Sequence, residues 1–128
     1  GSGYQTAILA RLAKHVFTIE RLAGLAECAM QNIAKLKIKN ISFKTGDGTI
    51  GWEENKPYDR IIVTAGAPEI PRPLVNQLAE NGKLVIPVVD SFMQTLKIIQ
   101  RKNGKIEVKD SIGCVFVKLI GRHGWDIH

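Results

Sequence analysis

Short runs of β-branched and aromatic residues alternate with helical stretches along most of the chain, and this alternation constrains the fold more than any other feature. Residues 4 to about 14 carry apolar side chains at helical spacing, and the strand-like run Val16–Glu20 follows them. Residues 21–36 return to helical periodicity before a second strand-like run, Ile41–Thr45. Strands that alternate with helices predict an α/β fold in which helices cover a mostly parallel sheet.

The second half of the chain continues this pattern and then changes it. In chain order we expect a strand, a short helix and a strand, at residues 60–64, 73–81 and 83–89. Gly82 is expected to end the helix. Apolar and polar residues then alternate around Asn103-Gly104, a pair typical of a tight hairpin because both central positions favour positive φ. With a last strand at residues 114–120, the order of elements predicts one domain, residues 1–128, whose sheet has a C-terminal antiparallel hairpin.

The charge balance is basic, but it does not favour nucleic acid as a partner. The net charge is +6, yet no aromatic side chains interleave with the densest basic group, Lys35, Lys37 and Lys39. A solvated basic face is therefore the better interpretation. No run of about 18 uncharged apolar residues is present, so no membrane span or membrane partner is predicted.

Cysteines and histidines are few and widely spaced. Cys28 and Cys114 match no paired motif, which predicts reduced, buried thiols and a cytoplasmic location. His15, His123 and His128 have no neighbours at the spacing of metal ligands, so no metal site is predicted. No pair of residues stands out as a nucleophile and its base.

Three features of the sequence fall at successive strand ends, where α/β folds bind ligands. Gly1-Ser2-Gly3 leads directly into the first helix, where glycines allow close approach to a ligand. Glu20 ends the next strand, 17 residues after Gly3, and is placed to accept hydrogen bonds from a ribose. Gly46-Asp47-Gly48 follows the next strand, and its carboxylate could accept a hydrogen bond from the amine of adenine.

Each feature also has a simpler interpretation. Gly1-Ser2-Gly3 could be a cloning linker, Glu20 a surface acid, and Asp47 a turn residue. Their common spacing argues for a nucleotide-like ligand. A dinucleotide motif would need a third small residue where this chain has Thr6, so the pattern favours an adenosine cofactor that lacks pyrophosphate.

Six segments, in order, resemble the protein-L-isoaspartate O-methyltransferase family. They are GSGYQTAILA, FTIER, GDGTIGW, PYDRIIVTAGAPEIP, GKLVIPV and FVKLIGRHGW. The longest, PYDRIIVTAGAPEIP, is specific to the family, and Tyr4 and Gln5 continue its first motif without a break, which disfavours the cloning linker. The resemblance implies a Rossmann-like fold, S-adenosylmethionine as the cofactor, and repair of damaged proteins by methylation of the free carboxylate of isoaspartyl residues.

The resemblance also implies a set of site residues. Expected at the cofactor are Gly1, Ser2, Gly3, Tyr4, Glu20, Arg21, Gly46, Asp47, Gly48 and Thr64. Expected at the isoaspartyl peptide are Ala65, Ala67, Pro68 and Val117. The glycines hold the methionine part, Glu20 holds the ribose, and Asp47 with Gly48 holds the adenine. Residues 64–68 would lie near the transferred methyl group.

Two departures from the family pattern qualify this expectation. Lys118 stands where the family usually has proline, so the flank of the peptide groove could differ. The family's N-terminal portion is absent, and with it a central strand between those that contain Ile19 and Ile62, together with the serine thought to contact the substrate. No catalytic residue is therefore assigned, and we expect the chain, a partial catalytic core, to be marginal or inactive alone.

The implied chemistry needs little from the protein. A carboxylate is ionised at neutral pH, so it can attack a sulfonium methyl group without a general base. The implied partners are isoaspartyl peptides and proteins, and the complete protein is expected to be a monomer. The open alternatives are a methyltransferase acting on nucleic acid or small molecules, and an inactive half-domain that works only through a partner chain.

Overall fold

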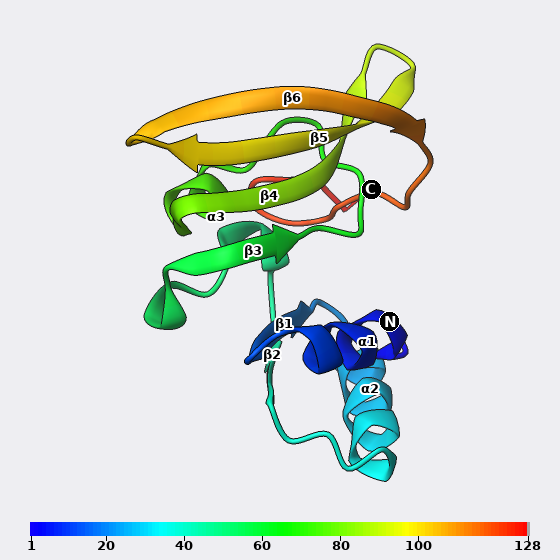
Figure 1. Cartoon of the computed structure of the whole chain (residues 1–128). Coiled ribbons are helices and arrows are strands. Elements are labelled where there is room, and N and C mark those ends of the chain that lie inside the picture. The colour runs from blue at the N-terminus through cyan, green and yellow to red at the C-terminus, as the bar shows by residue number, and fades with distance from the viewer. Residues whose placement is uncertain (128) are drawn as a thin grey trace. The chain divides into compact units, whose positions relative to one another are not determined.

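The computed structural model describes residues 1–127, and His128 lies outside the described residues. The chain divides into two compact units, Gly1–Gly48 and Thr49–His128, whose helices and strands are labelled in Figure 1. Each unit has its own sheet.

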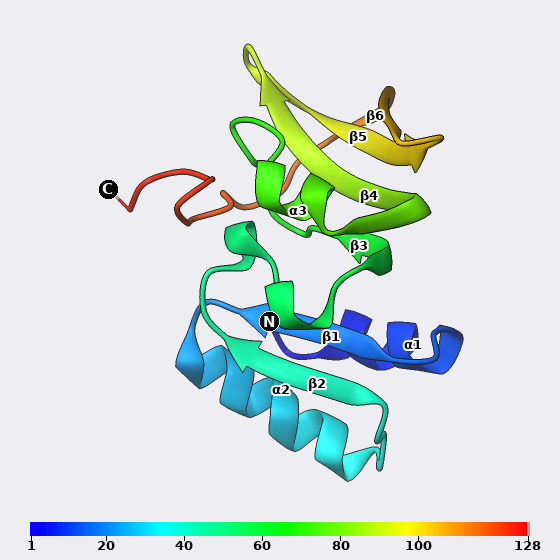
Figure 2. The same cartoon turned by 90° about the vertical axis from the view of Figure 1, so that its left-hand side faces the viewer.

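The first unit is built from two helices and two parallel strands. Its elements are α1 (Tyr4–Leu12), β1 (Val16–Glu20), α2 (Ala23–Lys35) and β2 (Ile41–Thr45). Figure 2 shows α2 running along the strand pair and α1 beside β1. Val16 lies opposite Ile41, and Glu20 lies opposite Thr45. Because the strands are parallel and in step, both end at the same edge of the unit.

The second unit holds a four-stranded mixed sheet. Its elements are β3 (Tyr58–Ile62), α3 (Arg72–Asn76), β4 (Leu78–Asp90), β5 (Met93–Lys102) and β6 (Lys105–Cys114). The strand order is β3-β4-β5-β6, with β3 parallel to β4 and the other two pairs antiparallel. Two short 3-10 helices, Gly48–Ile50 and Glu53–Asn55, precede β3. The predicted α/β class and the hairpin at Asn103-Gly104 are confirmed.

The boundary between α3 and β4 differs from the prediction. The helix ends at Asn76, and β4 already begins at Leu78 and runs through Gly82. Contacts from distant residues end the helix: the guanidinium of Arg101 donates to the carbonyl oxygens of Val75 and Leu78. Gly82 does not cap the helix but lies within β4. A Cβ there would lie 2.8 Å from the carbonyl oxygen of Ala79, so glycine is needed for the close approach of the two main-chain segments.

The prediction of a last strand at residues 114–120 is also wrong, because the residues after Cys114 do not pair along the sheet. β6 ends at Cys114, and the residues after it form only isolated bridges, Gly66 with Lys118 and Ile120 with Trp125. The β-branched composition of this segment is typical of a strand. The segment leaves β5, however, because the side chain of Gln94 occupies the main-chain groups of Phe116.

The cores of the two units differ in size. The second unit buries a cluster of apolar side chains: Ala67, Leu74, Leu78, Leu84, Ile86, Val88 and Ile99. The first unit buries only Ala10, Ala26, Ala29 and Ile33. Cys28, predicted to be buried, is exposed, because α2 turns only a narrow stripe toward the strands. Both thiols are free, and Cys114, also predicted to be buried, is only half-buried.

Two parallel strands each pair on one side only within residues 1–127. β1 pairs with β2, and β3 pairs with β4. These are the strands expected to border a further central strand, since Ile19 lies in β1 and Ile62 in β3. The arrangement of both units around such a strand in one domain stays a prediction.

We expect the replacement of Gly104 by alanine to destabilise the second unit by about 1 kcal/mol. Gly104 has φ of +71°, where a Cβ is unfavourable even though no other atom would lie within 4 Å of it. Gly113→Ala in β6 is the matched control, because its Cβ would make only ordinary contacts. Urea unfolding of the two variants measures the difference, and equal midpoints would contradict the assigned turn.

Candidate functional site

The amino-terminal glycines lie against α2 of the first unit. Gly3 precedes α1 with φ of +88°. A Cβ on Gly3 would lie 3.2 Å from Cβ of Ala29 and 3.2 Å from Cδ1 of Ile33. The left-handed backbone therefore favours glycine at this position, and a Cβ would also force Ala29 and Ile33 to move slightly. The turn brings exposed main chain to the start of α1, where helical N–H groups have no partner within the helix.

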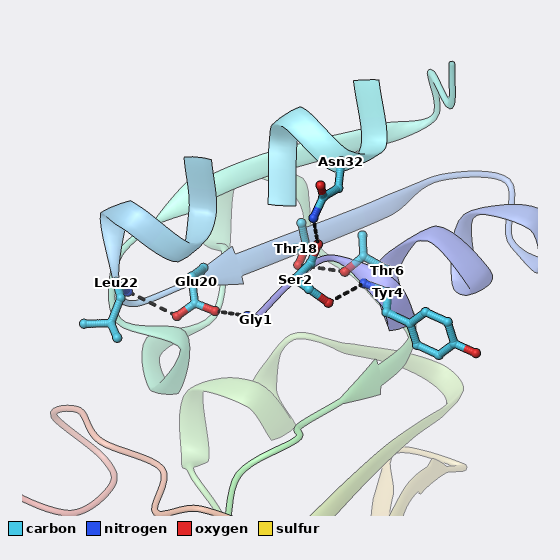
Figure 3. A network of polar contacts seen from close by, with 8 residues as sticks. All are labelled: Gly1, Ser2, Tyr4, Thr6, Thr18, Glu20, Leu22 and Asn32. Atoms are coloured by element: carbon cyan, nitrogen blue, oxygen red, sulfur yellow. Dashed lines mark hydrogen bonds and ion pairs between the residues drawn. The ribbon is translucent and has the colours of Figure 1, made fainter. Parts of the chain in front are cut away.

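Glu20 lies beside this turn, at the end of β1 (Figure 3). Its carboxylate lies within hydrogen-bond reach of the Gly1 nitrogen and accepts a hydrogen bond from the N–H of Leu22 at 3.1 Å. Partial burial raises the pKa of Glu20, whereas the hydrogen bond from the N–H of Leu22 lowers it. A glutamate carboxyl ordinarily ionises well below neutral pH, so Glu20 is an ionised acceptor.

Asn32 holds the glycine turn in a way that the sequence did not reveal. Its Nδ2 donates to the carbonyl oxygen of Ser2 at 3.0 Å, so α2 fixes the turn from the side (Figure 3). Thr6 and Thr18 add a contact between their hydroxyls at 3.4 Å. In the sequence, the role of Asn32 is indicated only by its position before Ile33, the residue that lies beside Gly3.

The end of β2 meets the end of β1 at the same edge. The N–H of Gly46 donates to the carbonyl oxygen of Glu20 at 2.9 Å, which continues the parallel pairing by one residue. Asp47 and Gly48 follow directly, and Asp47 is half-buried. The glycine turn, Glu20 and the Gly46–Gly48 loop thus converge on one edge of the first unit, whereas Arg21 is exposed beside it.

The remaining predicted residues belong to the second unit. They lie on two segments that Gly66 joins: its N–H donates to the carbonyl oxygen of Val117 at 2.7 Å. Val117 is 77% exposed, and Thr64 is exposed as well. Ala65 and Pro68 are half-buried, but Ala67 is fully buried among the core residues. Ala67 can therefore support this surface only from beneath.

Lys118 and Trp125 lie next to these segments. The ammonium of Lys118 is 5.4 Å from the centre of the Trp125 ring, a cation–π contact. The indole of Trp125 donates to the carbonyl oxygen of Gly66 at 2.9 Å. Lys118, which departs from the family pattern, thus packs its ammonium group over the ring of Trp125.

The described residues give no other candidate centre. Within residues 1–127, no group of three or more His, Cys, Asp and Glu side chains could hold a metal ion. In the same range, every helix is too short or too polar to cross a membrane. The first unit instead offers the Glu20 carboxylate as an acceptor and exposed main chain at the glycine turn.

Comparison with known proteins identifies relatives over nearly the whole chain. A family model described as protein-L-isoaspartate(D-aspartate) O-methyltransferase matches residues 1–124. Protein-L-isoaspartate O-methyltransferase 2 of Geotalea uraniireducens is 54% identical over 126 residues, which are 98% of this chain and 58% of that protein. The chain therefore spans less than two thirds of the length of this curated relative.

Two solved structures are similar to the chain. A protein-L-isoaspartate O-methyltransferase has a TM-score of 0.89 at 30% identity, covering 97% of this chain and 41% of that one. A chain from Plasmodium falciparum, described as the same kind of enzyme in complex with S-adenosyl-L-homocysteine, has a TM-score of 0.74 at 35% identity. That match covers 83% of this chain and 52% of the other.

Proposed function

The chain belongs to the protein-L-isoaspartate(D-aspartate) O-methyltransferase family, and on that premise we propose that it carries the cofactor-binding part of a protein-repair methyltransferase. The reaction transfers a methyl group from S-adenosylmethionine to the free carboxylate of isoaspartyl residues in damaged proteins. The observation that carries this proposal is the convergence of the glycine turn, Glu20 and the Gly46–Gly48 loop at one edge of β1 and β2.

Each part of this edge has a proposed role toward the cofactor. The turn formed by Gly1, Ser2, Gly3 and Tyr4 binds the methionine part, because glycines let main-chain groups approach closely. Glu20, ionised at neutral pH, accepts hydrogen bonds from both ribose hydroxyls, with Arg21 at the rim. The loop of Gly46, Asp47 and Gly48 binds the adenine, whose amine can donate to Asp47.

The second unit supplies the proposed peptide side of the reaction. We assign Thr64 to the cofactor, and Ala65, Pro68 and Val117 to the isoaspartyl peptide. Ala67 supports this surface from the core, since its own side chain is fully buried. The cation–π contact with Trp125 holds Lys118 away from the peptide, which allows a lysine in place of the usual proline.

The chemistry is a displacement in which the protein mainly aligns the reactants. S-adenosylmethionine, when bound, supplies the methyl group; a carbon–oxygen bond to the substrate carboxylate forms as the carbon–sulfur bond breaks. The substrate carboxylate is already ionised at neutral pH, so the chain needs no residue to remove a proton. Its residues hold the donor and acceptor in line and exclude water, which is enough for large rate effects.

We further propose the setting in which the enzyme works. Its partners are isoaspartyl peptides and proteins, and the complete protein acts as a monomer. The net charge of +6 suits anionic peptides. The two free thiols, Cys28 and Cys114, fit a cytoplasmic location.

A transfer assay tests the proposed function. The chain is incubated with S-adenosylmethionine labelled in its methyl group and with an isoaspartyl peptide, an aspartyl peptide of the same sequence, or RNA. Any label that the chain transfers is expected only in the isoaspartyl peptide, as a base-labile ester. Transfer to RNA or equal transfer to both peptides would contradict the proposal. Cofactor binding without any transfer would agree with a partial catalytic core, whereas no cofactor binding would contradict the proposal.

A further inference from the structure

The side-chain amide of Gln94, near the start of β5, pairs with the main chain of a distant segment. Its Nε2 donates to the carbonyl oxygen of Phe116 at 2.9 Å, and its Oε1 accepts from the N–H of Phe116 at 2.8 Å. A residue on a neighbouring strand would form the same pair of hydrogen bonds with Phe116. The side chain thus replaces strand pairing for Phe116, because β6 stops pairing with β5 at Cys114.

Gly66 lies directly against this amide. A Cβ on Gly66 would lie 2.9 Å from Cδ and from Oε1 of Gln94, so only glycine fits while the amide keeps its position. The N–H of Gly66 donates to Val117, the residue next to Phe116. The carbonyl oxygen of Gly66 accepts from the N–H of Leu119 at 2.9 Å and from Trp125 Nε1 at 2.9 Å. The main chain of Gly66 is therefore fixed on both sides.

These contacts join the two segments of the proposed peptide surface. Gln94 holds Phe116, and the next residue, Val117, is bonded to Gly66. Gly66 in turn sits between Ala65 and Ala67. The Gln94 amide and the main chain of Gly66 thus together hold the exposed Val117 beside residues 64–68.

We infer that Gln94 is a positioning residue for the peptide substrate, acting through Phe116 and Gly66. This inference rests on the proposed function. Within residues 1–127, the hydrogen bonds of the Gln94 side chain run to Phe116, which belongs to the second unit, and not to the predicted cofactor residues of the first unit. Loss of the amide should therefore weaken peptide binding and leave cofactor binding unchanged.

The variants Gln94→Leu and Gly66→Ala disturb this contact from its two sides. Leucine removes both hydrogen bonds at similar size, and alanine pushes its Cβ into the amide. Gln100→Leu is the matched control, because Gln100 lies in the same strand and is half-buried in the same way. We expect both test variants to raise KM for the isoaspartyl peptide about tenfold. The kcat and the Kd for S-adenosylhomocysteine should stay within about twofold of the parent chain.

Hydrogen–deuterium exchange gives a second readout that needs no activity. In Gln94→Leu the amides of Phe116 and Gly66 should exchange at least about tenfold faster, whereas those of buried Leu84 and Ile86 should not change. Unchanged exchange at Phe116 and Gly66 would overturn the role of Gln94 in holding the segment. Faster exchange with an unchanged KM, or an equal loss of kcat and cofactor affinity, would overturn its role toward the peptide. If the parent chain binds the cofactor but transfers no methyl group, exchange alone decides whether Gln94 holds Phe116; failure to bind the cofactor would contradict the proposed function.

Discussion

Glu20→Ala is expected to weaken the binding of S-adenosylhomocysteine to the chain about 100-fold. The carboxylate is ionised, and it is the proposed acceptor for both ribose hydroxyls. Hydrogen bonds to a charged group contribute about 1.5–3 kcal/mol each, and about 2.7 kcal/mol corresponds to the 100-fold loss. Isothermal titration calorimetry with S-adenosylhomocysteine measures the change directly.

Two further variants make this result specific to the carboxylate of Glu20. Glu20→Gln keeps the size but loses the charge, so it should fall between the parent chain and Glu20→Ala. Glu27→Ala removes an exposed carboxylate from α2 and should leave the affinity unchanged. A loss of less than about threefold in Glu20→Ala, or an equal loss in Glu27→Ala, would contradict the ribose assignment.

Gly3→Val is expected to destabilise the first unit by about 3 kcal/mol and to abolish cofactor binding at ordinary concentrations. The left-handed backbone at Gly3 costs about 1–2 kcal/mol for other residues, and β-branched residues tolerate it least. The added side chain would also press on Ala29 and Ile33, and such overpacking costs about 1–3 kcal/mol. Hydrogen–deuterium exchange of the β1 and β2 amides reports the opening free energy of the first unit.

Gly24→Val is the matched control for this prediction. Gly24 lies in the first turn of α2, and a Cβ there would have no atom within 4 Å. Valine and glycine differ by only a few tenths of a kcal/mol in helix propensity, so the opening free energy should stay the same within about 0.5 kcal/mol. If Gly3→Val behaves like Gly24→Val, then the close packing of the turn on α2 is wrong.

Local sequence patterns predicted the first unit well. β1 and β2 have the predicted bounds, because each is a short β-branched run that is interrupted on both sides by polar or helical residues. Because β1 and β2 are parallel and in step, Glu20 and Gly46 lie side by side where the two strands end. Strand bounds and parallel order alone therefore predict that these residues meet. The Asn103-Gly104 turn was equally local, since both residues adopt positive φ.

The predictions that were wrong involve segments whose partners are far away in the sequence. The helix predicted for residues 73–81 ends early because Arg101 bonds to Val75 and Leu78. Residues 115–120 have strand-like composition, but Gln94 takes the main chain of Phe116 and directs the segment to Gly66. Neither interaction leaves a pattern in the neighbouring residues.

The sequence alone therefore determined the class of fold, the family resemblance and the strand-end residues, because side-chain periodicity and the backbone freedom of glycine act within a few residues. Only the tertiary structure decided which side chains hold these parts in place. Asn32 reaches Ser2 across 30 positions, and Gln94 reaches Phe116 across 22. Such bonds depend on how helices and strands pack, since an amide can pair with any main-chain group that packing brings within reach.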